Sequence, residues 1–270
     1  MTSFWSRLKS LLAGEDGEAP PLDRVEPEVA SPRPGLPAEA ADDAHWQAVY
    51  GARQAWYEQA FGLFPSDILK MKNLTGVWPG GGLFALPADR VEPGLWLYTT
   101  FGLSNPGMPA RVVSRDVQIA PDGSFSGTLQ AKAPESIVVP PPGAAGYGYE
   151  FALVVRDSVQ WPLWVLQWAA SAELLQDVNL LDRVDKHEGL TVQEIAIDDG
   201  RHVNLLIAKA RAPLPQGTTL PNGRMDLLVA TVITEDEMRW SMQHGRGALL
   251  ERLMARGVGQ VSALGRASVV

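Results

Sequence analysis

Apolar residues recur along this chain at spacings that predict several helices. After Ala38, and again after Trp161, apolar side chains return every three or four residues, which places them on one face of a helix. A further helix is predicted to begin at Thr234, because Thr234 and Glu237 have the spacing of a capping box. This last helix is expected to continue without a break to Arg256.

Other runs are short, rich in β-branched and aromatic residues, and bounded by turn-forming residues, which is typical of strands. These runs are 95–101, 112–119, 124–130, 147–155, 190–197, 203–209 and 225–233. The C-terminal segment VSALGRASVV is also predicted to close as a strand. Strands and helices are mixed and do not strictly alternate, so we expect an α+β fold with a central mixed, largely antiparallel sheet flanked by helices.

The N-terminal part of the chain differs from the rest. Residues 1–13 (MTSFWSRLKSLLA) are predicted to form a short amphipathic helix that either packs on its own domain, docks on a partner or associates weakly with a membrane. Residues 14–37 are rich in proline and acidic side chains and are predicted to be a disordered linker. Residues 38–270 are expected to form one folded domain.

The composition excludes several classes of protein. Of the 270 residues 46% are hydrophobic and 20% are charged, as in a globular protein. The chain has no cysteine, which excludes disulfides, a thiolate nucleophile and Cys-ligated metal centres. A formal net charge of −8 argues against general binding of nucleic acid, which requires many Lys and Arg side chains. No apolar run predicts a transmembrane helix, and a cytoplasmic location is expected.

Candidate chemistry is sparse, and we predict no catalytic, cofactor-binding or metal-binding residue. The acidic residues around His187 are interpreted as a solvated loop and not as a metal site. Glycines 80–82 lack the Lys-Ser/Thr pair of a phosphate-binding loop and indicate a flexible turn in a loop-rich zone. Glu150 is a lone charge inside a predicted buried strand. It could be a general acid or base, but such a residue is more often satisfied by backbone groups or an arginine.

Aromatic residues suggest where a protein partner could bind. Trp161, Trp164 and Trp168 share one face of the predicted helix, which is more typical of a core-facing helix than of an aromatic binding surface. We take candidate contacts from the edge of this helix and from the strand and loop at 98–104, and we expect most of the aromatic side chains to be buried. The candidate protein-binding residues are Tyr98, Phe101, Ser104, Glu150, Trp161 and Trp164.

Five segments in this order resemble the suppressor of fused domain, over about residues 40–270. The segments are LWLYTTFGLSNP (95–106), GYGYEFALVV (146–155), WPLWVLQWAA (161–170), LPNGRMDLLVATVITEDEM (220–238) and an Arg-Ser ending near Ser268. The family's T-x-G-x-S strand corresponds here to Thr100, Gly102 and Ser104. Its F-E-L-T strand corresponds to Tyr149-Glu150-Phe151-Ala152, so the final threonine is replaced, and its Arg-rich ending is partly kept as Gly265-Arg266-Ala267-Ser268.

The resemblance implies an α/β-type domain with no known catalytic activity. Animal members restrain transcription factors of the Hedgehog pathway by protein–protein contact, and shorter bacterial members are proposed as immunity proteins in polymorphic toxin systems. We therefore expect a non-catalytic protein-binding module, an immunity protein that binds and neutralises a cognate toxin encoded nearby. The acidic charge suits a basic toxin. The alternatives are a membrane-peripheral adaptor tethered by residues 1–13 and, least favoured, an uncharacterised enzyme using Glu150.

Overall fold

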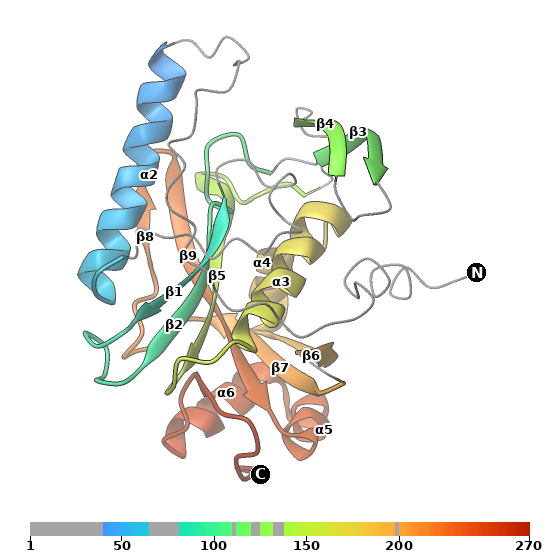
Figure 1. Cartoon of the computed structure of the whole chain (residues 1–270). Coiled ribbons are helices and arrows are strands. Elements are labelled where there is room, and N and C mark those ends of the chain that lie inside the picture. Colours follow the sequence, from blue (N-terminus) through green and yellow to red (C-terminus); the bar gives the residue numbers. More distant parts are fainter. Residues whose placement is uncertain (1–39, 65–80, 110–111, 120–124, 132–137, 198–199) are drawn as a thin grey trace.

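The computed structural model describes residues 40–64, 81–109, 112–119, 125–131, 138–197 and 200–270 (Figure 1). The helices are α2 (Ala40–Ala60), α3 (Pro162–Gln176), α4 (Leu180–His187), α5 (Glu235–His244) and α6 (Arg246–Ala255). The strands are β1 (Gly82–Pro87), β2 (Trp96–Phe101), β3 (Val112–Ile119), β4 (Phe125–Ala131), β5 (Ala144–Val155), β6 (Leu190–Ala196), β7 (His202–Lys209), β8 (Gly217–Leu220), β9 (Gly223–Ile233) and β10 (Val261–Ser262). The predicted N-terminal helix and its linker lie outside the described residues, so both stay predictions.

An eight-stranded mixed sheet forms the centre of the domain, with the strand order β1-β2-β5-β9-β7-β6. β8 pairs with β9 and β10 pairs with β5 outside this path, while β3 and β4 form a separate hairpin. β5 runs parallel to β9 and to β10, and the remaining pairs are antiparallel. The expected α+β class with a mixed, largely antiparallel central sheet is therefore confirmed.

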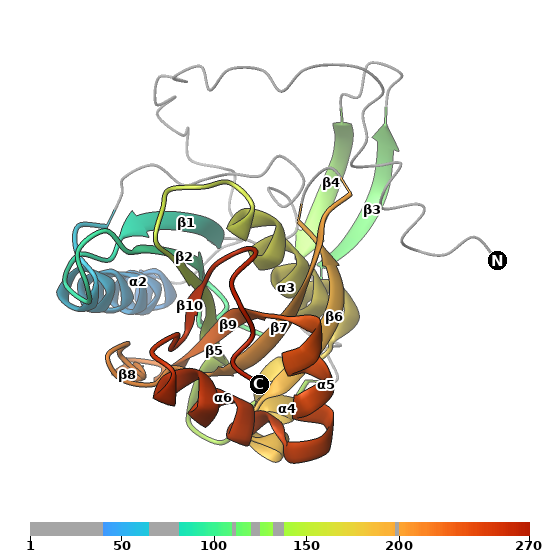
Figure 2. The ribbon, with the colours of Figure 1, turned by 90° about the horizontal axis from the view of Figure 1, so that it is seen from below.

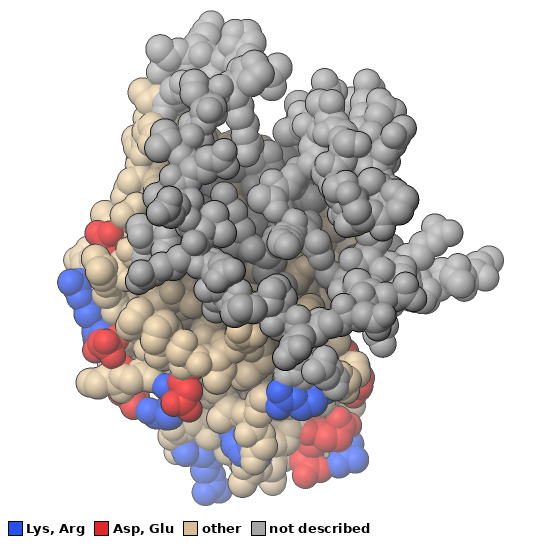
Figure 3. Space-filling model, in the orientation of Figure 1, with Lys and Arg blue, Asp and Glu red and all other residues tan. Residues whose placement is uncertain are grey.

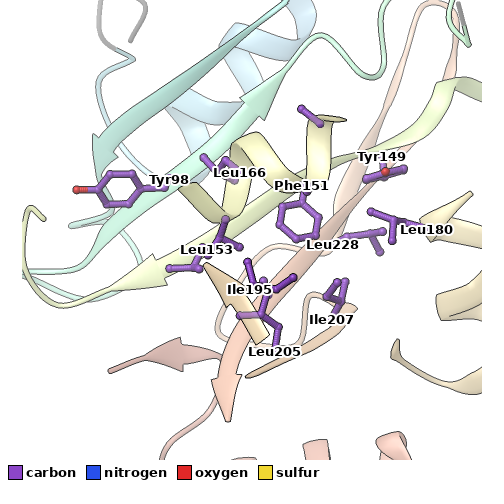
Figure 4. Close-up of a cluster of buried hydrophobic side chains, with 14 of the residues drawn as sticks. Tyr98, Tyr149, Phe151, Leu153, Leu166, Leu180, Ile195, Leu205, Ile207 and Leu228 are labelled. Carbon is purple, nitrogen blue, oxygen red and sulfur yellow. The ribbon is translucent and has the colours of Figure 1, made fainter. Parts of the chain in front are cut away.

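Helices cover both faces of this sheet (Figures 1 and 2). In β5, Phe151 and Leu153 point to the core under α3 and α4, whereas Ala152 and Val154 point to the core under α2. The α5–α6 pair covers the same face as α2 but over β7 and the end of β9. Figure 4 shows the larger core, where side chains from β2, β5, β7 and β9 meet α3. β5 is buried on both faces, which explains why it reads as a continuous apolar run.

The prediction of one unbroken helix from Thr234 to Arg256 is wrong, because this segment forms two helices. α5 ends at Gly245, whose φ of 96° is a conformation that side chains rarely adopt, and α6 begins directly after it. A Cβ atom on Gly247 would lie 2.8 Å from Glu188 Oε2, so the second glycine allows α6 to approach the end of α4. The capping box at Thr234 and Glu237 is confirmed.

Two further local predictions are corrected. The loop-rich zone after the glycines at 80–82 contains β1, an edge strand that pairs in register with β2. The predicted solvated loop around His187 is the end of α4, an amphipathic helix that buries Leu180, Leu181 and Val184. Both elements are short, and tertiary pairing decides their conformation more than local propensity does. Among the described residues, no helix is long and apolar enough to cross a membrane.

Candidate functional site

Glu150 lies fully buried in the middle of the domain, on the face of β5 that α2 covers. The chain leaves β2 at Phe101 and turns at Gly102, which has a φ of 131°. This turn wraps residues 102–105 around the Glu150 carboxylate, so that consecutive backbone N–H groups point at it. A concave loop of this kind is a general way to hold an anion.

The Glu150 carboxylate is saturated with hydrogen bonds. Oε1 accepts the backbone N–H groups of Gly102 (2.8 Å) and Ser104 (3.0 Å) and the Ser104 hydroxyl (2.6 Å). Oε2 accepts the Thr100 hydroxyl (2.7 Å) and the backbone N–H of Leu103 (3.3 Å). The three residues that match the family's T-x-G-x-S strand therefore all bind the glutamate of its F-E-L-T strand, and both motifs belong to one site.

Arg53 completes this cluster from α2. Its Nη1 donates to Glu150 Oε1 (3.3 Å) and to the Ser104 hydroxyl (2.8 Å), and its Nη2 donates to the Asn105 side chain (2.6 Å). The guanidinium also lies over the Phe101 ring, 3.9 Å from the ring centroid. Burial lowers the pKa of Arg53, and the charge of Glu150 opposes that change, so the ion pair keeps a charged arginine inside the core.

This geometry suits an anchor and not a proton-transfer group. A carboxylate has about four lone-pair positions, and Glu150 already faces more donors than that, which leaves no acceptor site for a substrate. The pocket lined by His202 does not include Glu150. The expectation that Glu150 is satisfied by backbone groups and an arginine is confirmed. It ties α2, β2, the 102–105 loop and β5 together.

The structure brings some of the predicted binding residues together and separates others. Phe101, Ser104 and Glu150 meet in the Arg53 cluster, whereas Tyr98 and Trp161 lie under α3 in the other core. All five are buried, and Trp164 alone of the six candidates is half-buried. The expectation that most of these aromatic side chains are buried is confirmed. A role for the six in binding stays a prediction.

A second buried carboxylate, Glu237, holds the C-terminal segment. Arg266 donates from Nη1 to Glu237 Oε1 (2.6 Å) and from Nη2 to Oε2 (2.5 Å). The same carboxylate accepts the backbone N–H groups of Thr234 (2.9 Å) and Val269 (2.9 Å). The partly kept family ending at Arg266 is therefore a clamp that fixes the end of the described chain to α5.

Sequence reasoning missed Arg53 and the partner of Arg266. A signal for Arg53 exists, because it is a charged residue at an apolar position of the helical pattern that includes Val49 and Trp56. A charge on such a stripe indicates a buried partner elsewhere. For Arg266 the local sequence carries no such signal. Its partner, Glu237, could be interpreted only as part of a capping box.

Glu173 in α3 is a buried carboxylate with fewer partners. Oε1 accepts the backbone N–H of Leu180 at the start of α4, whereas Oε2 has no hydrogen-bond partner among the described residues. Burial raises the pKa of Glu173, and the N–H group of Leu180, the nearby Tyr149 hydroxyl and the N–H group of Asn179 only partly offset this effect. The Glu173 side chain therefore joins α3 to α4, but its ionised form destabilises the fold.

We predict that Glu173→Gln makes the domain more stable near neutral pH. A carboxyl whose pKa is higher in the folded than in the unfolded state stabilises the fold below its unfolded pKa of about 4.3, and this contribution is lost as the pH rises through the folded value. The gain from Glu173→Gln should therefore grow as the pH rises above the unfolded pKa of about 4.3 in urea unfolding measurements. Glu251→Gln, an exposed change on α6, is the control. A difference between wild type and Glu173→Gln that does not vary with pH would contradict this prediction.

No group of three or more His, Asp or Glu side chains is placed to hold a metal ion in the described part of the chain. The acidic residues around His187 do not converge: Asp185 pairs with Lys209, and Glu188 packs against Gly247. The arrangements that stand out are therefore two buried carboxylates paired with arginine: Glu150 fixes the 102–105 loop to β5, and Glu237 fixes the C-terminal segment to α5.

The chain is similar to one protein family and to crystal structures of suppressor of fused proteins. The model of the family described as Suppressor of fused protein (SUFU) matches residues 65–267. No curated protein matches this chain. A crystal structure of the Sufu-Fu complex is 16% identical, with 83% of this chain and 92% of that chain covered and a TM-score of 0.48. The crystal structure of Drosophila Suppressor of Fused is also 16% identical, with 83% of this chain covered and a TM-score of 0.46. This chain spans 51% of the Drosophila chain.

The family match covers most of the chain and includes both buried carboxylates, Glu150 and Glu237, whereas Arg53 lies before the matched residues. It contains the Thr100–Ser104 turn, the Glu150 strand and Arg266, which are the segments that first suggested the family. The chain therefore belongs to the suppressor of fused family.

Proposed function

We propose that this chain is a non-catalytic protein-binding module that acts as an immunity protein, neutralising a basic protein toxin. The observation that carries the proposal is the match to the suppressor of fused family over residues 65–267. The formal net charge of −8 supports a basic partner, because opposite charge speeds and orients association.

The site geometry supports a binding role more than a catalytic one. The cluster around Glu150 and Arg53 is fully buried and bound mainly to its own groups, so it exposes no side chain to a reactant. Such a cluster instead gives the strands and the 102–105 loop one defined position. A rigid framework lowers the entropic cost of binding another protein, because less of the surface must be ordered at that moment.

The described surface carries charges of both signs. Figure 3 shows Lys and Arg side chains interspersed with Asp and Glu over the lower part of the molecule. No broad basic face is visible on the described part of this view, in keeping with a protein partner and not a nucleic acid. Half-buried Trp164 on α3 remains our candidate contact residue.

The test is co-expression with the product of the neighbouring gene. We expect a stable complex on size-exclusion chromatography and rescue of growth when the neighbour is toxic. Trp164→Ala should weaken the complex at least about tenfold, as for an aromatic hot spot. Trp46→Ala, which changes a half-buried tryptophan on α2, is the matched control. Absence of both a complex and growth rescue would contradict the proposed function.

A further inference from the structure

A pocket of about 380 Å³ lies at the end of the sheet where β7 begins and β9 ends. The residues that line it include Glu194, His202, Asn204, Glu235 and Arg266. Leu264, from the segment clamped by Glu237, closes part of it. The pocket is separate from the Glu150 cluster, and the family-like ending at Arg266 forms one of its borders.

Some of the polar groups in this pocket are already used. Asn204 accepts the backbone N–H of Glu194 (3.2 Å) and donates to Glu235 Oε2 (2.9 Å), so one buried amide positions both acidic residues. The terminal nitrogens of Arg266 are occupied by Glu237 and backbone carbonyls. Arg201, which also lines the pocket, has a partner as well. The positive charges of the pocket are therefore largely committed.

The groups with free capacity are mainly acceptors. The exposed Glu194 carboxylate has no hydrogen-bond or ion-pair partner among the described residues, and the second oxygen of Glu235 is equally open. Glu194 has a φ of 57°, which is rare for a residue other than glycine, at the point where the pairing of β6 with β7 is interrupted. Backbone strain of this kind is concentrated at functional sites.

Apart from His202 and Thr234, the remaining side chains that line the pocket are apolar. Ile197, Val203 and Val232 are buried at the pocket, and Leu264 is 37% exposed there. A ligand that fits these walls has an apolar stem that ends in a cation. An amino-acid residue of a peptide has these features, whereas a bare cation does not.

We propose that this pocket receives a lysine or arginine side chain of a protein partner. The methylene groups of that side chain pack on Leu264 and Ile197, and its cation lies between Glu194 and Glu235. Pairs of charges that are partly desolvated at the centre of an interface contribute strongly to binding, and arginine is enriched at such positions. This assignment deepens the proposed function, because it gives the basic partner a defined point of contact.

The pocket can be tested without knowing the partner. We would titrate the full ¹⁵N-labelled chain with the methylamides of acetyl-arginine, acetyl-lysine, acetyl-norleucine and acetyl-glutamate and follow amide chemical shifts. The arginine and lysine compounds should give saturable shifts at Leu264, Gly265 and the Asn204 side chain, with affinities of about 1–10 mM, as expected for a single anchored side chain. The norleucine and glutamate compounds should bind at least about tenfold more weakly.

A double variant, Glu194→Gln with Glu235→Gln, should weaken the arginine compound at least about tenfold while the spectrum stays folded. The matched control is Asp236→Asn with Glu251→Gln, which removes two exposed carboxylates outside the pocket. Equal binding of norleucine and arginine, absence of saturable shifts, or an unchanged affinity in the double variant would overturn the pocket assignment. A partner complex that forms but is insensitive to the double variant would refute the pocket and leave the protein-binding function standing.

Discussion

Replacing Glu150 by alanine is expected to reduce the free energy of unfolding by about 4 kcal/mol or more. The change leaves the Arg53 charge buried without its partner, and breaking a buried ion pair on one side costs about 3–5 kcal/mol. It also leaves the N–H groups of Gly102, Leu103 and Ser104 without their acceptor. Because domains are stable by only about 5–15 kcal/mol, this loss is a large fraction of the total stability and should clearly lower the midpoint of unfolding. The free energy of unfolding can be measured by urea or thermal unfolding followed by tryptophan fluorescence.

Replacing Arg53 in place of Glu150 distinguishes the contribution of the ion pair from that of the hydrogen bonds to the 102–105 loop. Arg53→Met removes the charge but leaves Glu150 with all its hydroxyl and backbone donors, so we expect a smaller loss of about 2–3 kcal/mol. The control is Arg156→Ala, which breaks an exposed ion pair with Glu92 and should cost less than about 0.5 kcal/mol. A loss below about 1 kcal/mol for Glu150→Ala, or equal losses for both cluster variants, would show that the loop does not depend on this carboxylate.

Glu237→Ala is expected to cost about 3 kcal/mol and to free the C-terminal segment. The substitution removes half of a capping box, which is worth about 1 kcal/mol, and leaves Arg266, 12% exposed, without its bidentate partner. It also removes the acceptor for the Val269 backbone N–H. Hydrogen exchange should therefore accelerate at Val269 while α3 stays protected. Asp236→Ala, a neighbouring exposed acid in the same helical turn, is the control and should leave this exchange unchanged.

The same carboxylate gives the wild type a defined loss of stability in acid. Burial alone would raise the pKa of Glu237, but Arg266 and the N–H groups of Thr234 and Val269 outweigh burial, and the pKa is lowered. The stabilisation is therefore present above the unfolded pKa of about 4.3 and is lost as the pH falls through the folded value. Glu237→Ala should lose stability less steeply than the wild type in that range. If the stabilities of the wild type and Glu237→Ala fell in parallel with decreasing pH, the stabilising role of the ionised Glu237 carboxylate would be contradicted.

The local pattern of the sequence predicted the regular elements well. The strands at β2, β5, β7 and β9 and the helices α2 and α3 follow from periods of two and of three to four residues, because burial on one or both faces requires them. The capping box at Thr234 was also predictable, since both of its partners lie within one helical turn. Elements that depend on distant neighbours, such as β1 and α4, were not.

The sequence by itself determined a cysteine-free, acidic α+β domain with a charged residue in a buried strand. It could not identify the partner of that residue, because Glu150 and Arg53 are separated by 97 positions and meet only when α2 packs on the sheet. Sheet order likewise brings Glu194 of β6 and Glu235, the first residue of α5 after β9, to one pocket. The spacing of hydrophobic residues reflects only neighbours along the chain. The pairing of buried charges depends on which faces of the helices and the sheet pack together. The tertiary structure therefore decided what each charged side chain does.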